Sequence, residues 1–270
     1  MVSCLSPPSG PATAAELHRL LASSLAARLA ELKAPETTLR SKLVKALPTT
    51  MTLAVLQRTD PAAGMYACHL FQAGDSRAYV AEPDGGLRQL TTDQLRSGGD
   101  AMRNLTDDSV MSNCISADTE FSIDHHQVQL QAPFLLLCAT DGCFAYVRSP
   151  MHFEHLLLST MQDARDVPAW QQASEAEVTA ITGDDAAIAL LGLGADLDGF
   201  KQLFRDRTDE LGRRYIDPLD ELDGQVHQAE QQLAGLRARR VELGAELWGS
   251  YKGGYERYQA EAEPAGEEAP

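Results

Sequence analysis

The spacing of apolar residues divides the chain into a helix, a region of short strands and a long helical end. Over residues 12–33, leucines recur at helical spacing, and charged or polar side chains occupy the opposite side. The leucines of this stripe are Leu17, Leu20, Leu21, Leu25, Leu29 and Leu32. The pattern predicts an amphipathic helix that covers a core. A membrane-surface helix is the less favoured alternative, because the polar side has few lysines and arginines.

From residue 49 the pattern changes to short apolar runs of the kind that form strands. The runs lie at 51–56, 65–71, 78–81, 87–91, 121–130 and 134–138. Turn residues separate the first of them, for example Pro-Asp-Gly-Gly at 83–86, which indicates antiparallel hairpins. The run at 134–138 is apolar throughout and is predicted to be a central strand. The polar stretch 92–118 is expected to be part helix and part loop.

Helices are predicted at 153–164 and 168–181, followed by a last apolar strand at 186–193. Strands, helices and a returning strand are typical of an α+β domain built in layers. We assign this domain to residues 1–194. Its first residues contain no signal-peptide pattern. The sequence also contains no apolar run long enough to cross a membrane.

Residues 195–260 are rich in charged and helix-forming residues, so a domain boundary is predicted after residue 194. Apolar positions there follow heptad spacing, with an imperfect continuation: Leu219, Leu222, Val226, Ala229, Leu233 and Leu236, then Arg240, Leu243 and Leu247. The spacing predicts a coiled coil or a helical hairpin, with residues 219–247 as a surface for self-association. Four aromatic residues follow, Trp248, Tyr251, Tyr255 and Tyr258. We expect them to pack on a hairpin partner or the domain; an exposed binding surface is the alternative. Residues 261–270 form an acidic tail that is expected to be disordered.

The charge and the cysteines narrow the classes of function. A net charge of −16 and a pI near 4.8 oppose nucleic-acid binding, which needs clustered lysines and arginines. The five cysteines form no Cys-x-x-Cys pair, and three of them lie in apolar or mixed runs; the five are Cys4, Cys68, Cys114, Cys138 and Cys143. Such cysteines indicate reduced thiols. Together these features predict a cytoplasmic protein that does not bind membranes or nucleic acid.

Three short acidic motifs lie at the ends of predicted strands: Gly-Asp-Ser-Arg at 74–77, Thr-Asp-Gly at 140–142 and Gly-Asp-Asp at 183–185. Carboxylates held at the mouths of strands suit Mg²⁺ and Mn²⁺, which prefer oxygen ligands. Two such ions can activate water for hydrolysis of a phosphate ester. Each motif alone is an ordinary turn, so the signal lies in their order.

In this order the motifs resemble the protein phosphatase 2C (PPM) family. That family has a Gly-Asp-Ser-Arg-Ala hairpin, matched by residues 74–78, and a Leu-Thr-x-Asp element, matched with a shift by 90–93. It continues with an apolar strand ending in Ser/Thr-Asp-Gly, matched by 134–142, and with an Asp-Asn or Asp-Asp pair, matched by 184–185. The run at 47–51 also resembles the start of the family's first paired strand.

The resemblance implies two stacked antiparallel β-sheets flanked by helices, with a site for two Mn²⁺ or Mg²⁺ ions at the sheet ends. By position, Asp141 and Asp184 match metal ligands. Asp75 matches a residue of a further, looser metal site, and a structural role for Asp75 is an equal alternative. The implied function is hydrolysis of phosphoserine and phosphothreonine in protein substrates, within signalling and with a serine/threonine kinase as a counterpart.

The sequence departs from the family pattern in two places. The family's Asp-Gly-x-Gly-Gly motif, which supplies further metal ligands before the first long helix, has no counterpart here, and Ala145 stands where many members have an aspartate. We therefore expect slight or no activity from the isolated chain. Either the coding sequence begins further upstream, which is the favoured explanation, or the chain is a non-catalytic member that acts as a scaffold or regulator through its C-terminal coiled coil.

Two other sites are disfavoured. A zinc site from His125, His126, His152 and His155 with Cys138 and Cys143 does not fit structural zinc spacing. A cysteine nucleophile at Cys143 would lie beside Asp141, whose negative charge raises rather than lowers a thiol pKa.

Overall fold

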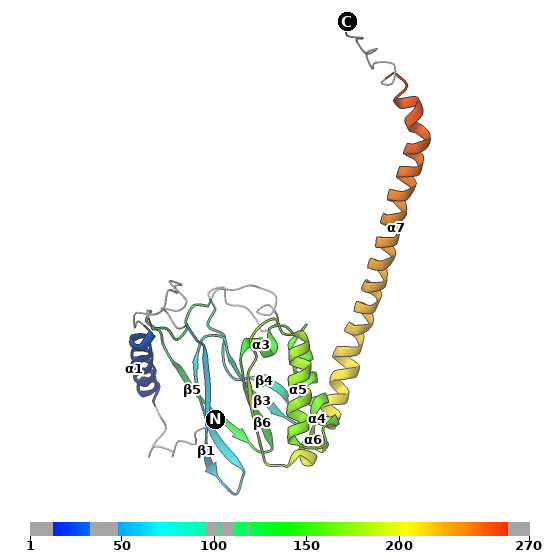
Figure 1. Ribbon diagram of the computed structural model, residues 1–270. Helices are drawn as coiled ribbons and strands as arrows, with labels where there is room; N and C mark the ends of the chain where they lie inside the picture. The colour runs from blue at the N-terminus through cyan, green and yellow to red at the C-terminus, as the bar shows by residue number, and fades with distance from the viewer. Residues whose placement is uncertain (1–12, 33–47, 96–101, 103–110, 118, 259–270) are drawn as a thin grey trace. The chain divides into compact units, whose positions relative to one another are not determined.

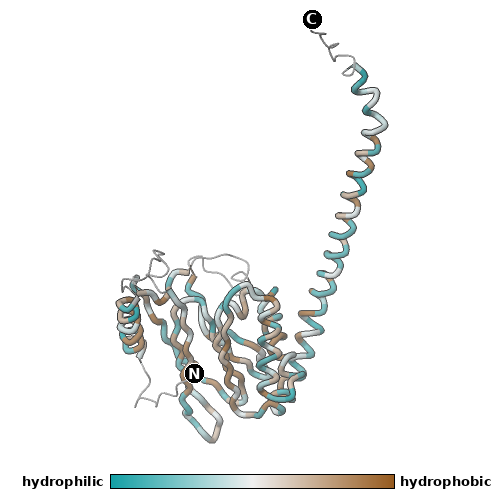
Figure 2. Tube along the Cα trace, viewed as in Figure 1, coloured by the Kyte–Doolittle hydropathy of each residue, from teal (hydrophilic) through white to brown (hydrophobic). Residues whose placement is uncertain are grey.

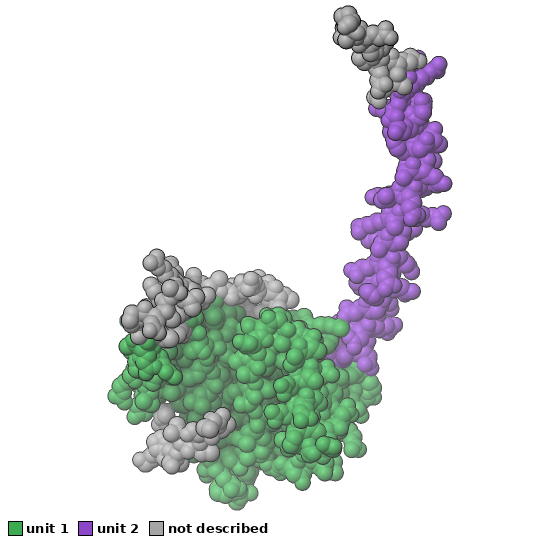
Figure 3. Space-filling view, in the orientation of Figure 1, with its two compact units in different colours: residues 1–213 green, residues 214–270 purple. Residues whose placement is uncertain are grey.

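The computed structural model describes residues 13–32, 48–95, 102, 111–117 and 119–258. The chain divides into two compact units, residues 1–213 and 214–270 (Figure 3). The first unit runs past residue 194, because helix α6, Leu197–Leu211, packs on helix α4, Pro150–Asp163. The acidic tail 261–270 and most of the stretch 92–118 lie outside the described residues.

Two antiparallel sheets form the centre of the first unit (Figure 1). One has the order β1-β2-β5, formed by Met51–Asp60, Met65–Ala73 and Asp124–Gln131. The other has the order β4-β3-β6-β7, formed by Gly86–Gln89, Arg77–Glu82, Phe134–Ala139 and Ile188–Leu193. The α+β class with two antiparallel sheets is therefore confirmed, and so is the central position of β6.

The core between the sheets follows from the alternation of side chains along each strand. Cys68 and Leu70 of β2 and Leu130 of β5 pack with Val80 of β3 and Leu136 of β6. Residues with the opposite orientation on β3 and β6 face the helices, because successive side chains of a strand point to opposite faces. Ala81, Leu135 and Leu137 accordingly meet α4 and helix α5, Val167–Ile181. The four-stranded sheet is thus covered on both faces.

Local sequence signals fix the ends of the helices. Ser149 accepts a hydrogen bond from the His152 backbone and begins α4. Asp166 and Asp196 do the same for the amides of Ala169 and Gly199, at the starts of α5 and α6. Prolines occupy the first turns of α4 and α5, where a missing N–H costs nothing. The predicted helices at 153–164 and 168–181 are confirmed, with α4 beginning earlier than expected.

A partly buried ion pair ties the helices to the sheet. Both guanidinium nitrogens Nε and Nη2 of Arg207, on α6, lie 2.8 Å from the carboxylate of Glu154, on α4. The same carboxylate accepts the backbone N–H of Leu87 at 3.0 Å. Three elements therefore share one carboxylate, which positions α4 over the sheet.

Helix α1, Ala14–Leu32, confirms the predicted amphipathic helix. Leu17, Leu21, Leu25 and Leu29 are half-buried along one side, while Leu20 is exposed. Thr13 and Glu16 form a reciprocal capping box at its start. Among the described residues, no helix is both long and apolar enough to cross a membrane.

The second unit consists of helix α7, Asp217–Tyr255, which follows a π-helical turn at Gly212–Ile216. The helix is continuous over 39 residues, so the hairpin alternative is wrong within the described range. No residue of α7 is buried. The aromatic residues Trp248, Tyr251 and Tyr255 contact one another along the helix at ring-centroid distances of 5.6–6.3 Å and remain exposed. Packing of this cluster on a hairpin partner is therefore excluded.

Candidate functional site

The turn at residues 74–76, between β2 and β3, holds Asp75 in a fixed place. Gly74 has a φ of +101°, and a Cβ there would lie 2.6 Å from the Thr50 side chain, so only glycine fits. Its backbone N–H donates to Gln94 Oε1 at 2.7 Å. Thr50 and Ser76 hydroxyls are joined at 2.6 Å. The turn is therefore anchored on both sides of the aspartate.

Arg77, at the start of β3, is a buried structural residue. Its guanidinium donates to both carboxylate oxygens of Asp93, at 2.8 and 2.6 Å, and both side chains are 4% exposed. The group also lies 4.1 Å above the ring of Phe144. The pairing explains why the Gly-Asp-Ser-Arg and Leu-Thr-Thr-Asp motifs occur together: the arginine of the first binds the aspartate of the second. Sequence reasoning recognised both motifs but missed this link.

Asp141 begins the short helix α3, Asp141–Phe144, directly after the central strand β6. The preceding Thr140 continues the ladder toward β7: its N–H donates to the Ala187 carbonyl at 2.9 Å, and its hydroxyl accepts the Ala187 N–H at 2.9 Å. A Cβ on Gly142 would overlap the carbonyl of Asp185. The glycine therefore allows the backbone that carries Asp141 to approach the backbone of the Asp184-Asp185 loop.

Asp184 lies in the turn between α5 and β7. The Thr182 hydroxyl accepts the Asp184 N–H at 3.2 Å, and Asp184 Oδ1 accepts the Asp185 N–H at 2.7 Å. These bonds make a compact polar turn, and Asp184 itself is exposed to solvent. The structure thus brings the 140–142 and 184–187 segments together through their backbones.

The negative charge of Asp141 acts on the carboxyl group of Asp75. Burial raises the pKa of Asp75, and the negative charge of Asp141 raises it further, whereas the Asp75 backbone N–H and Arg77 lower it. A raised pKa means that the ionised form of Asp75 is disfavoured in the folded chain. Its contribution to stability is present below pH 4 and is lost as the pH rises through the folded pKa.

The three predicted ligands do not form a preformed metal cluster. Within the ranges that the structure describes, no group of three or more His, Cys, Asp or Glu side chains converges to hold a metal ion. The charge of Asp141 acts on Asp75, and Asp184 lies on the loop whose backbone packs against Gly142. The assignment of Asp75, Asp141 and Asp184 as metal ligands stays a prediction.

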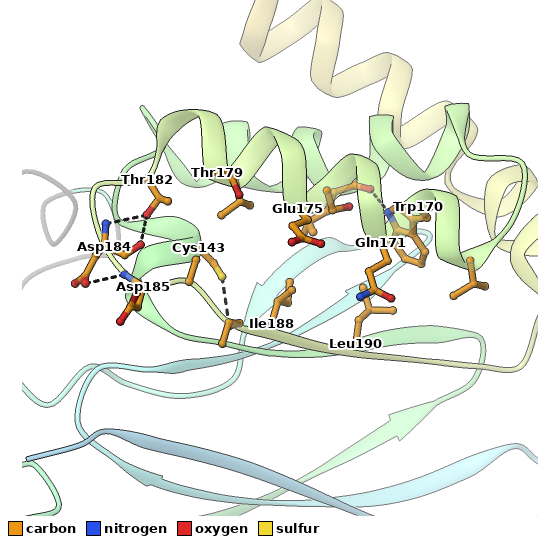
Figure 4. A pocket seen from close by; sticks show the side chains of 16 residues that line it. Cys143, Trp170, Gln171, Glu175, Thr179, Thr182, Asp184, Asp185, Ile188 and Leu190 are labelled. Carbon is orange, nitrogen blue, oxygen red and sulfur yellow. Dashed lines mark hydrogen bonds between the residues drawn. The ribbon is translucent and has the colours of Figure 1, made fainter. Parts of the chain in front are cut away.

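A pocket of about 660 Å³ opens between α5 and β7. Figure 4 shows Asp184, Asp185 and Thr182 at one end and Trp170, Gln171 and Leu190 at the other. Its floor includes exposed apolar residues of the edge strand β7, among them Ile188 and Leu190. The sequence predicted β7 as a strand but gave no sign of this pocket, because sequence spacing does not show that α5 folds back alongside β7.

The disfavoured zinc and cysteine sites find no support in the described residues. His125 and His126 belong to β5, whereas His152 and His155 belong to α4, on the far side of the other sheet. The Cys143 thiol donates to the Ala187 carbonyl, and burial raises its pKa. Burial likewise raises the pKa of Cys68 to about 11. The described cysteines are free and are buried or half-buried, and burial raises the pKa of Cys68, Cys138 and Cys143, which makes these three thiols poor nucleophiles.

The close approach at Gly142 gives a direct test of the local geometry. The Gly142→Ala variant is expected to lower the free energy of unfolding by about 1–3 kcal/mol, because the new methyl group must displace the Asp185 backbone. Chemical denaturation of the full chain measures this loss. Gly85→Ala is the matched control, since a Cβ there meets its nearest atoms at 3.6 Å, an ordinary contact. Equal stability of the two variants would contradict the packing described here.

Comparison with known proteins identifies the family. The family model for protein phosphatase 2C matches residues 4–177. Among solved structures, a bacterial serine phosphatase aligns at 18% identity over 67% of this chain and 68% of its own, with a TM-score of 0.48. Stp1 from Staphylococcus aureus aligns at 16% identity over 67% and 66%, with a TM-score of 0.48.

The catalytic domain of the serine/threonine phosphatase PstP, in complex with 2 manganese ions, aligns at 17% identity over 68% of this chain and 72% of its own, with a TM-score of 0.45. No curated protein matches the chain. The family match covers more than half of the sequence and includes the first two acidic motifs, Gly-Asp-Ser-Arg at 74–77 and Thr-Asp-Gly at 140–142. The chain belongs to the protein phosphatase 2C family.

Proposed function

We propose that this chain is a metal-dependent protein serine/threonine phosphatase that uses Mn²⁺ or Mg²⁺. The observation that carries the proposal is the like-charged pair Asp75 and Asp141, held in rigid turns at the ends of β2 and β6. A negative charge that opposes the ionisation of the half-buried Asp75 is a costly arrangement in a chain that binds no cation. Family membership supplies the reaction class.

The donor set fits a hard divalent cation. Asp75 and Asp141 offer carboxylate oxygens, and Asp184 lies on the loop that packs against the Asp141 turn. We infer that these residues contribute part of the ligand set of the family's two-ion centre. The metal, when bound, supplies a Lewis acid for the phosphoryl group and lowers the pKa of a bound water.

The remaining residues of the site position these carboxylates. Arg77 is fully engaged with Asp93 and Phe144, so its role is to hold the 74–77 turn rather than to bind phosphate. Thr140 and Gly142 join the Asp141 turn to the Asp184 loop. The pocket beside Asp184, with its apolar end at Trp170 and Leu190, suits a substrate side chain that flanks the phosphorylated residue.

The test is release of phosphate from phosphoserine and phosphothreonine peptides by the full chain with Mn²⁺, with Mg²⁺ and with chelator. We expect slight but metal-dependent release from both peptides, because the family's Asp-Gly-x-Gly-Gly ligands have no counterpart in this sequence, and less from a phosphotyrosine peptide. A parallel measurement of Tm should show an increase with Mn²⁺ that is reduced in Asp75→Asn. Absence of both hydrolysis and the Mn²⁺-dependent Tm shift would overturn the proposal.

A scaffold or regulator that acts through α7 is the second candidate. It is favoured by the absence of a three-ligand cluster in the described ranges and by the exposed apolar stripe of the helix. Capture of a partner, such as a cognate serine/threonine kinase, that survives Asp141→Ala and Asp184→Ala supports the scaffold. Loss of hydrolysis in the same variants supports the enzyme.

We also propose a cytoplasmic location. The four cysteines within the described residues are unpaired, although Cys68 and Cys138 are close enough for one to raise the pKa of the other. Neighbouring thiols that remain reduced are typical of a reducing compartment.

A further inference from the structure

Helix α7 has an apolar stripe along one side that is exposed to solvent in the single chain. The stripe repeats along the helix at alternating steps of three and four residues. Figure 2 shows apolar positions interspersed among polar ones along α7. Its members include Leu219, Leu222, Val226, Leu233, Leu236, Leu243 and Leu247, each at least 39% exposed. A 39-residue helix without a buried residue gains little stability from its own hydrogen bonds in water. The stripe therefore calls for an apolar partner of similar length.

The charges along α7 are separated by sign. The first half carries acidic residues without lysine or arginine: Asp217, Asp220, Glu221, Asp223 and Glu230. The second half contains the basic residues Arg237, Arg239, Arg240 and Lys252, with Glu242 and Glu246. Two copies side by side in parallel would bring acidic half against acidic half. An antiparallel pair brings each acidic half against a basic half, which is the favourable arrangement.

The stripe also has one register in which every core position finds a suitable counterpart. When Leu233 of one copy faces Leu236 of the other, Val226 faces Leu243 and Leu222 faces Leu247. In that register Arg240, the one charged residue of the seam, faces Ala229, the smallest. A long side chain opposite a methyl group avoids overlap and lets the guanidinium reach solvent. A single polar core residue of this kind fixes register.

The same register places oppositely charged residues beside the seam. Glu230 and Arg237 occupy equivalent flanking positions, and antiparallel alignment brings Glu230 of each copy next to Arg237 of the other. The contact occurs twice in a two-fold pair. In a parallel pair, Glu230 would instead face Gln225, and Arg237 would face Gln232.

We propose that α7 pairs with α7 of a second copy of this chain as an antiparallel two-stranded coiled coil centred between Leu233 and Leu236. The seam runs from Leu222 to Leu247 in both copies. This inference goes beyond the proposed phosphatase activity and does not depend on it, because all of its residues lie in the second unit.

Sedimentation equilibrium of the full chain tests the pairing. The unchanged chain is expected to dimerise, and Leu236→Asp is expected to abolish the dimer. Glu230→Arg alone and Arg237→Glu alone should each weaken association at least about tenfold, because two attractive contacts become repulsive. The exchange Glu230→Arg with Arg237→Glu should restore affinity to within about threefold of the original.

Glu242→Arg is the matched control for the charge change, because residue 242 lies on the same helix away from the seam. It is expected to leave the dimer intact. Circular dichroism of each variant establishes that the helix is retained. A monomer at all concentrations overturns the proposal. If the chain dimerises but the losses of affinity from Glu230→Arg and Arg237→Glu add up in the double variant, the antiparallel register is wrong.

Discussion

The Asp141→Asn variant is expected to release phosphate from a phosphoserine peptide at least about 100-fold more slowly than the unchanged chain in the presence of Mn²⁺. Asparagine retains the shape of the side chain and can still accept the Gly142 N–H, which Asp141 Oδ1 accepts at 3.0 Å. It lacks the negative charge that a divalent cation requires. Initial rates at saturating Mn²⁺, together with a Mn²⁺ titration, measure the loss.

Asp84→Asn is the control for this experiment. Asp84 is an exposed aspartate in the turn between β3 and β4. Its replacement by asparagine removes the same charge from the chain as Asp141→Asn does. The rate of Asp84→Asn should equal that of the unchanged chain. Full Mn²⁺-dependent activity in Asp141→Asn would show that the metal is held elsewhere, and the assignment of Asp141 would be wrong.

The Arg77→Leu variant is expected to lower the free energy of unfolding by about 3–5 kcal/mol, the largest loss of stability among the changes considered. The substitution leaves the carboxylate of Asp93 buried without its guanidinium partner. Leucine fills much of the space over Phe144, so the loss reflects the unpaired charge more than a cavity. Urea denaturation followed by tryptophan fluorescence measures it.

Two companion variants separate charge from packing. Arg88→Leu removes an arginine from an exposed ion pair with Glu82 and should cost less than about 1 kcal/mol. The double variant Arg77→Leu with Asp93→Leu removes both buried charges and should be more stable than Arg77→Leu alone. Additive losses in the double variant would show that the two residues act independently, contrary to the bidentate geometry.

The spacing of apolar residues and the residue types at turns were enough to predict most of the fold from the sequence. The apolar run at 134–138 is the central strand β6, and its position follows from a side-chain pattern that leaves no polar face. The extent of the first unit was harder to predict. Helix α6 looks polar in sequence, yet Phe200, Phe204 and Leu211 are buried, and Arg207 is held by Glu154. Because only a few apolar residues of α6 are buried among many charged ones, its sequence pattern is similar to that of a solvent-exposed helix.

The site was predictable only in its parts. The order of the motifs located the turns that carry Asp75, Asp141 and Asp184, because glycine and aspartate mark turns at strand ends. Distances between those turns depend on how strands far apart in sequence pair, and sequence spacing does not contain them. The overlap of a Gly142 Cβ with Asp185 and the engagement of Arg77 by Asp93 are of this kind.

The two tryptophans of the chain fall one to each compact unit. Trp170 is 7% exposed and donates its indole N–H to the Leu157 carbonyl, whereas Trp248 is 45% exposed on α7. Their fluorescence should therefore separate by wavelength, the enclosed indole emitting toward the blue and the hydrated one toward the red. A single spectrum then carries an independent optical reporter for each half of the molecule, without any added dye.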